Sequence, residues 1–341
     1  MRRALVLGSN LALGALLLAW LLYRFGGPAL ARLEPTVSVP RLAGFGAVAA
    51  IAIVSFAWRW RYILAGLGTP PPLGPLTLFR AAGQSLASLV PSAKIGGDPL
   101  RAWLAVRSRV PPQDAIASVA IDRALEIGAA VPFSIVFAAV LIQQGVPRLE
   151  NAFATTMFGA LALAVAMAVT ARRLERGKGL VTSLVRSTRL DAFPVVEKQM
   201  DVMAASEAAA ATLVRQRRRM GLAFALGMGT NLLVLLEFTL LLSAFGLPAH
   251  PVAVVAAIFA TAAAHQLPVP GGLGVLEGGQ MWLFGVLGHP PEVGLAVGLA
   301  VRLRELVWAL PGLIYLLARW IGRSPSAVAE TEKPLQAWRE G

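Results

Sequence analysis

The stretch Pro91-Ser-Ala-Lys-Ile-Gly-Gly-Asp98 returns in altered form 179 positions later as Pro270-Gly-Gly-Leu-Gly-Val-Leu-Glu277. Each copy is a glycine-rich break inside apolar sequence. Aligned without gaps at this separation, residues 90–135 and 269–314 share 12 identical residues in 46 positions. The identities include Arg123 with Arg302 and Glu126 with Glu305. The chain therefore contains an internal repeat, and this repeat is the basis of the fold prediction.

The composition is that of a polytopic membrane protein. Of 341 residues, 57% are hydrophobic and only 14% are charged, and the mean hydropathy is +0.67. The net charge of +13 comes from Lys and Arg clusters between apolar segments, which indicates positive-inside topology rather than nucleic-acid binding. Without cysteine, the chain has no disulfide, no thiolate nucleophile and no cysteine metal site.

The predicted fold is all-α, with about six transmembrane helices and two re-entrant helical hairpins near residues 76–109 and 251–288. The motif Trp58-Arg-Trp-Arg61 is interpreted as an interfacial anchor that ends the second span. The expected divisions are a signal-anchor helix and outer loop (1–41), a first repeat with an extra span (42–170), a basic cytoplasmic helical linker (171–219), a second repeat (220–320) and a cytoplasmic tail (321–341).

The distribution of basic residues indicates that the two repeats are inverted. Residues 57–113 carry seven Lys or Arg, whereas the equivalent residues 236–292 carry none. By the positive-inside rule, the same unit then faces opposite sides of the membrane, and both termini lie inside. The alternative is that Val252–Leu267 forms a complete span, which would remove the inversion. Inverted repeats with broken helices at mid-membrane are typical of transporters.

Two charged pairs are the strongest candidates for a functional site. Arg123 and Glu126, like Arg302 and Glu305, are three positions apart and share a helix face. Ionised side chains cost about 2.5–3.5 kcal/mol each at the centre of a bilayer, so we expect them to face protein or a wet cavity. In the functional interpretation, the guanidinium groups bind a phosphate headgroup. In the structural one, the charges only fix the hairpins to the long helices. They then pair within each helix, or Arg123 and Arg302 cross to Glu277 and Asp98.

The glycine breaks admit two interpretations. Their backbone N–H groups, next to the N-termini of short helices, can bind an anion. Alternatively, glycine only permits the tight turn. Proton coupling through Asp98, Glu277 or His265 is a further hypothesis. The predicted substrate-binding residues are Lys94, Gly96, Gly97, Asp98, Arg101, Arg123, Glu126, Gly271, Gly272, Glu277, Arg302 and Glu305.

Sequence motifs of enzymes are absent. Gly177-Lys178 lacks the upstream glycine of a P-loop, and no G-x-S-x-G motif occurs. The three histidines, His250, His265 and His289, do not have a helical metal-binding spacing. We therefore predict no enzymatic activity, no cofactor and no metal.

Several motifs together resemble the transmembrane region of lysylphosphatidylglycerol synthases, a family also called flippase-like. They are Leu89-Val-Pro-x(4)-Gly-Gly-Asp-x-x-Arg101, Asp122-Arg123, Leu267-Pro-Val-Pro-Gly-Gly-Leu-Gly-Val-x-Glu277 and Arg302-x-x-Glu305. The resemblance covers nearly the whole chain. It implies lipid translocation or lipid binding, and it argues against lysyl transfer because the C-terminal transferase domain is missing. The first motif has fewer glycines than the family pattern.

The resulting hypothesis is an ATP-independent lipid flippase or transporter of the bacterial inner membrane, acting on an anionic or modified phospholipid or a related amphiphile. The alternative is a non-transporting accessory or scaffold subunit for a lipid-modifying enzyme, with residues 171–219 as its docking surface. A membrane-embedded transferase would need a reactive site that the sequence does not show. The Gly294/Gly298 spacing is weak evidence for a homodimer.

Overall fold

The computed structural model describes residues 2–33, 37–68, 70–89, 96–143, 150–189, 193, 197, 199–267 and 269–321. Within these ranges every regular element is helical, which confirms the all-α prediction. The helices are α1 (Arg2–Leu33), α2 (Val39–Leu64), α3 (Leu73–Leu89), α4 (Asp98–Arg107), α5 (Pro112–Gln143), α6 (Glu150–Glu175), α7 (Val181–Ser187), α9 (Met200–Arg215), α10 (Arg217–Ala244), α11 (Pro251–Ala264), the 3₁₀ turn η3 (Pro270–Gly272), α12 (Val275–Val286) and α13 (Pro291–Ile321).

Proline marks the start of several helices. Pro40, Pro99 and Pro251 lie in the first turns of α2, α4 and α11. There the missing N–H costs nothing, and the fixed φ angle already suits a helix. At α11 the side chain of His250 adds a cap, because its Nδ1 accepts a hydrogen bond from the backbone N–H of Ala253 at 3.4 Å.

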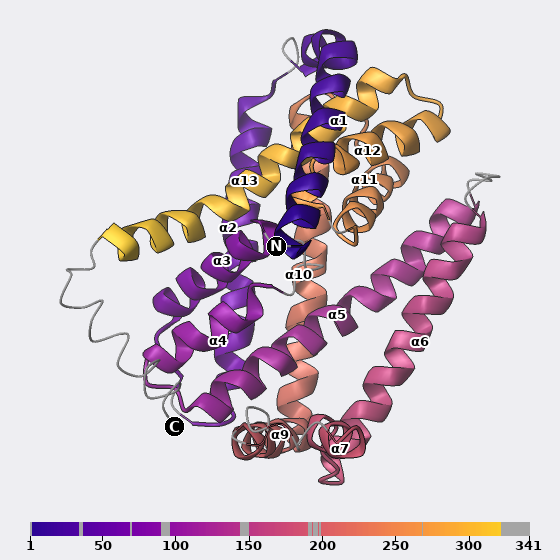
Figure 1. Ribbon diagram of the computed structural model, residues 1–341. Helices are drawn as coiled ribbons and strands as arrows, with labels where there is room; N and C mark the ends of the chain where they lie inside the picture. The colour runs from indigo at the N-terminus through magenta and orange to yellow at the C-terminus, as the bar shows by residue number, and fades with distance from the viewer. Residues whose placement is uncertain are drawn as a thin grey trace.

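Four described helices are long and apolar enough to cross a membrane: Val39–Leu64, Pro112–Val140, Met157–Glu175 and Arg217–Ala244. This number is lower than the six expected. Among the described residues, Ala15–Ala31 of α1 and Pro251–Ala264 are shorter apolar helices. Helix α13 has the necessary length but carries Arg302, Arg304 and Glu305 within four positions. Figure 1 shows α7 and α9 at one end of the bundle, with α11 and α12 towards the other.

Helix boundaries recur between the two halves of the chain. The pairs α2 and α10, α3 and α11, α4 and α12, and α5 and α13 begin 178, 178, 177 and 179 positions apart, at Val39 and Arg217, Leu73 and Pro251, Asp98 and Val275, and Pro112 and Pro291. Pro132 and Pro311, also 179 positions apart, lie inside the two long helices α5 and α13. The order of long, short, short and long helix is thus the same in both halves.

Helix α3 packs closely against α4 on one side and against α13 of the second half on the other. A Cβ atom added to Gly97 would lie 1.9 Å from the carbonyl oxygen of Gly83, and one added to Gly312 would lie 2.1 Å from the carbonyl oxygen of Ala81. The hydroxyl of Ser85 donates to the carbonyl oxygen of Ala309 at 2.5 Å. Backbone therefore touches backbone at both interfaces, and glycine is required for the close approach.

We expect Gly312→Ala to destabilise the protein, because its methyl group would collide with a helix backbone that cannot rotate away. Overpacking of this kind costs about 1–3 kcal/mol. The matched control is Gly221→Ala in α10, where no atom lies within 4 Å of the added Cβ. Thermal unfolding of the detergent-solubilised protein should show a lower midpoint for Gly312→Ala only. Equal midpoints for the two variants would contradict this packing.

Two sequence interpretations need correction here. In the proposed interfacial anchor, only Trp58 is half-exposed, while Arg59 and Trp60 are fully buried and Trp60 donates to Ser118 Oγ at 3.1 Å. Gly294 and Gly298 face α12 of the same chain, since added Cβ atoms would lie 2.4 Å and 3.0 Å from backbone atoms of Met281 and Glu277. Their spacing is therefore explained by intramolecular packing, and it no longer supports a homodimer.

Candidate functional site

Asp122 lies at the centre of the first group of charged residues. Its carboxylate is fully buried and accepts hydrogen bonds from Arg59 at 2.8 Å, Arg80 at 3.2 Å and Arg101 at 2.6 Å. The four side chains come from α5, α2, α3 and α4 respectively. Charged groups in an apolar environment are stable only when paired, so this carboxylate holds α2, α3, α4 and α5 together.

Arg123 and Glu126 extend the same group. Arg123 binds both oxygens of Asp98, at 2.8 Å and 3.0 Å, and donates to Glu126 at 3.2 Å. Glu126 also accepts from Arg80 at 2.7 Å and from Arg59 at 3.4 Å. The group is called the N-terminal charge cluster below, and its members are Arg59, Arg80, Asp98, Arg101, Asp122, Arg123 and Glu126.

The C-terminal charge cluster comprises His265, Glu277, Arg302 and Glu305. Arg302 donates to Glu277 Oε1 through Nε at 3.0 Å and Nη2 at 2.7 Å, and to Glu305 at 2.8 Å. His265, at the end of α11, contacts Glu305 through Nε2. Oε2 of Glu277 is buried without a hydrogen-bond partner among the described residues.

The two clusters repeat the same ion pairs at equivalent positions. Arg123 pairs with Asp98 and Glu126, and Arg302 pairs with Glu277 and Glu305. Each arginine thus binds the acidic residue at the start of the short helix in its own half. The crossed pairing that the sequence allowed, in which Arg123 and Arg302 reach Glu277 and Asp98, does not occur.

At the second break, the backbone carbonyl oxygens of the glycines bind an arginine, whereas the anion-binding hypothesis concerned the backbone N–H groups. Gly271 and Gly272 are in the left-handed region, with φ angles of 61° and 59°. Their carbonyl oxygens accept hydrogen bonds from Arg302, and the N–H of Gly272 donates to Val269 O at 2.9 Å. Gly97 has a φ angle of −86° and permits close packing, whereas Gly96 is half-buried in the preceding turn. Lys94 lies outside the described residues.

Glu126 and Glu305, from the two clusters, line one cavity between the halves. The cavity has a volume of about 130 Å³. Glu126, Val234 and Glu305 lie near the middle of α5, α10 and α13, so the cavity is far from both ends of these long helices. Its lining residues are Phe56, Arg80, Gln84, Glu126, Val234, Arg304, Glu305 and Trp308.

Arg304 and Glu237 were not identified from the sequence. Arg304 donates to Glu237 at 2.9 Å, and Trp308 donates to the same carboxylate at 2.6 Å. The Arg304 guanidinium also lies over the rings of Phe238 and Trp308, at 4.8 Å and 5.1 Å. The sequence signal for this pair was a glutamate inside the apolar run 221–245, and the structure shows that this side chain is fully buried.

The charges of these groups balance. The two clusters and the Arg304–Glu237 pair together contain six arginines and six carboxylates, and His265 is the remaining titratable side chain among them. Arg304 lines the cavity, and its Nε is buried without a hydrogen-bond partner among the described residues. A buried donor without an acceptor costs about 1–3 kcal/mol, which an acceptor oxygen of a ligand would recover.

Long apolar helices around buried charge clusters define the chain as a multi-pass helical membrane protein. The family described as the lysylphosphatidylglycerol synthase TM region matches residues 6–312. The chain belongs to this family, as its motifs predicted, and the match concerns the membrane region. A comparison with curated proteins gave no match.

Proposed function

We propose that this protein is an ATP-independent lipid flippase that binds an anionic or modified phospholipid headgroup in the cavity between its two halves. The observation that carries the proposal is the cavity itself, where equivalent glutamates of both halves meet Arg80 and Arg304. Planar guanidinium groups are suited to bind phosphate through two parallel hydrogen bonds. Membership of the flippase-like family supports this substrate class.

The recurring boundaries and ion pairs support an inverted repeat with two re-entrant hairpins, α3–α4 and α11–α12. Two equivalent hairpins of opposite orientation can exchange inward-open and outward-open states around one central site. In this mechanism, a headgroup phosphate competes with Glu126 for Arg80 and with Glu237 for Arg304. The predicted residues of both clusters, with Gly271 and Gly272, then hold the hairpins that open and close the site.

The proposal places the protein in the bacterial inner membrane with both termini in the cytoplasm. The basic residues between α6 and α10 supply the argument, because positively charged loops remain on the cytoplasmic side. The substrate reaches the cavity from the bilayer, so its acyl chains can stay in the lipid while its headgroup crosses through protein.

The test is translocation of headgroup-labelled phospholipids in proteoliposomes that contain the purified protein. We expect Arg304→Lys to reduce the rate by about tenfold to hundredfold, because lysine keeps the charge but loses the two-pronged hydrogen bonding. Arg319→Lys in the exposed last turn of α13 is the matched control and should transport normally.

Two results would count against the proposal. Normal transport by folded Arg304→Lys would remove the cavity as the headgroup site. No movement of any lipid class by well-folded wild-type protein would reject translocation and favour the accessory role, for which purification of a partner would be the next step.

A further inference from the structure

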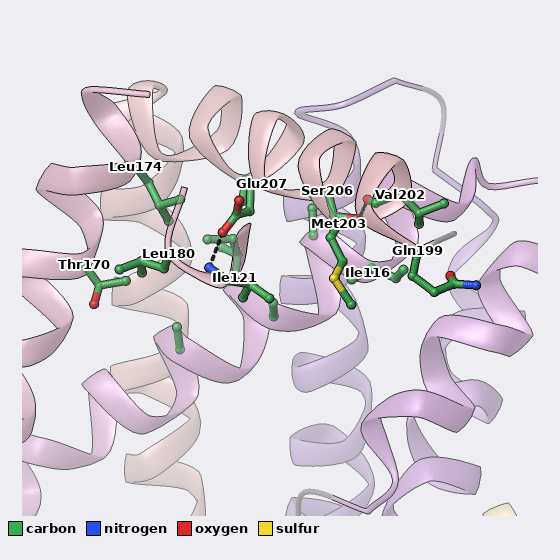
Figure 2. Close-up of a pocket in the computed structure, with 15 residues that line it drawn as sticks. Ile116, Ile121, Thr170, Leu174, Leu180, Gln199, Val202, Met203, Ser206 and Glu207 are labelled. Carbon is green, nitrogen blue, oxygen red and sulfur yellow. Dashed lines mark hydrogen bonds between the residues drawn. The ribbon is translucent and has the colours of Figure 1, made fainter. Parts of the chain in front are cut away.

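A second hollow, lined by residues of α5, α6, α7 and α9, lies away from the charge clusters. Figure 1 shows α7 and α9 at one end of the bundle. The volume of the hollow is about 430 Å³, within the usual range of small-molecule sites. Of the fifteen lining residues, Thr170, Gln199, Ser206 and Glu207 are polar and eleven are apolar. Figure 2 shows that side chains of α5, α6 and α9 point into the hollow. They include Ile116 and Ile121 of α5, Thr170 and Leu174 of α6, and Val202 and Met203 of α9.

A polar hollow of about 370 Å³ adjoins the apolar one, and the two share Leu174 and Glu207. The carboxylate of Glu207 is fixed at this boundary, because it accepts hydrogen bonds from the backbone N–H of Val181 and from the hydroxyl of Thr182. Arg215 lines the polar hollow, and its guanidinium donates to the carbonyl oxygen of Glu175 at 3.0 Å and 3.2 Å. The site thus combines an apolar chamber with a polar chamber that carries a positioned cation.

The surrounding charge favours an anionic ligand. Residues 171–219 contain eleven Lys or Arg and five Asp or Glu. Basic residues at the end of membrane-spanning helices attract anionic lipids by about 1 kcal/mol each. Helices α5 and α6, which form one wall, are themselves candidate spans, so a ligand can enter the apolar chamber from the bilayer.

We propose that this site holds one anionic phospholipid, with an acyl chain in the apolar chamber and the headgroup towards Arg215. The lipid is a bound partner and is not transported, so the inference does not depend on the proposed flippase activity. Its headgroup would join α6 to α9 at Arg215, and its chain would fill the space between α5 and α9.

The test uses two phospholipid probes with the same photoactivatable acyl chain, phosphatidylglycerol and phosphatidylcholine, added in trace amounts to nanodiscs that contain the whole protein. Crosslinked peptides are then identified by mass spectrometry. We expect the phosphatidylglycerol probe to label α5 and α9 in preference to the phosphatidylcholine probe. Arg215→Gln should reduce this labelling about fivefold, which corresponds to the loss of one basic contact.

Matched variants separate the site from general lipid contact. Ala120→Trp should abolish the labelling, because Ala120 is exposed in the chamber wall and a larger side chain there fills the chamber without disturbing the core. Thr170→Phe provides a second filling variant. Two control variants should be labelled as strongly as the wild type. Val136→Trp changes an exposed residue of the same helix outside the chamber, and Arg217→Gln changes an exposed residue outside both chambers.

Equal labelling by the two probes would overturn the proposal, because it would mean contact with ordinary bilayer lipid only. Labelling that persists in both chamber-filling variants would also overturn it. The Arg304→Lys protein should retain full labelling even where transport is lost. This result distinguishes a failure of the second lipid site from a failure of the flippase mechanism.

Discussion

Replacement of Asp122 by alanine should destabilise the protein more than any other single change in the N-terminal charge cluster. One carboxylate there accepts hydrogen bonds from Arg59, Arg80 and Arg101, all of them buried. Without it, three guanidinium groups remain in an apolar environment with too few acceptors. Breaking a buried ion pair by removing one partner costs about 3–5 kcal/mol. We therefore expect little folded protein, as measured by size-exclusion chromatography after expression at 25 °C and 37 °C.

Asp122→Asn is the informative companion, because asparagine preserves the shape and one acceptor oxygen but removes the charge. It should also be destabilised, though less than Asp122→Ala. Asp201→Ala, an exposed aspartate in the first turn of α9, controls for the loss of an acidic residue alone. A stable, monodisperse Asp122→Ala protein would refute the central role of this carboxylate.

The second large effect is expected for Arg302→Ala. Arg302 is the partner of Glu277, whose side chain is only 1% exposed, and it also binds Glu305 and two carbonyl oxygens of η3. Alanine would leave a buried carboxylate without its cation, again at a cost of about 3–5 kcal/mol. The variant should unfold at a lower temperature, and loss of transport would follow from the loss of folded protein.

A double variant separates stability from function. Arg302→Gln combined with Glu277→Gln removes both charges and retains groups that can hydrogen-bond. The double variant should unfold at a higher temperature than Arg302→Gln alone, because the two residues are directly coupled. If Arg302 contributes to headgroup binding, the folded double variant will still transport poorly in proteoliposomes. Normal transport by it would restrict Arg302 to fixing the α11–α12 pair.

The sequence predicted those parts of the fold and site that depend on local spacing. The repeat at 179 positions, the pairs at i and i+3 and the family motifs can all be read from the linear sequence, and they located Arg123, Glu126, Arg302 and Glu305. The match to the family model confirms the family. The structure confirms the helical class and brings these residues together with Asp98 and Glu277. Their role in substrate binding stays a prediction.

Other members of the site depend on tertiary contacts that a linear pattern does not contain. Arg59 lies in a motif typical of an interfacial anchor, and only the packing of α2 against α3, α4 and α5 shows that it faces inward. Likewise Arg304 and Glu237 are 67 positions apart, and no periodicity relates them. Four of the six expected spans are found among the described residues, and α13, which was expected to be another, carries three charges near its middle.

The position of α3 has a consequence for the independence of the two repeats. This helix belongs to the first repeat by sequence, yet its backbone is in contact with α13 of the second, and α10 packs against α2 of the first. A chain cut between α6 and α9 would therefore yield two fragments, and each would expose the surface that contacts the other half in the intact protein. Although the repeats are units of sequence, α3 with α13 and α2 with α10 form contacts that join the two halves of the chain.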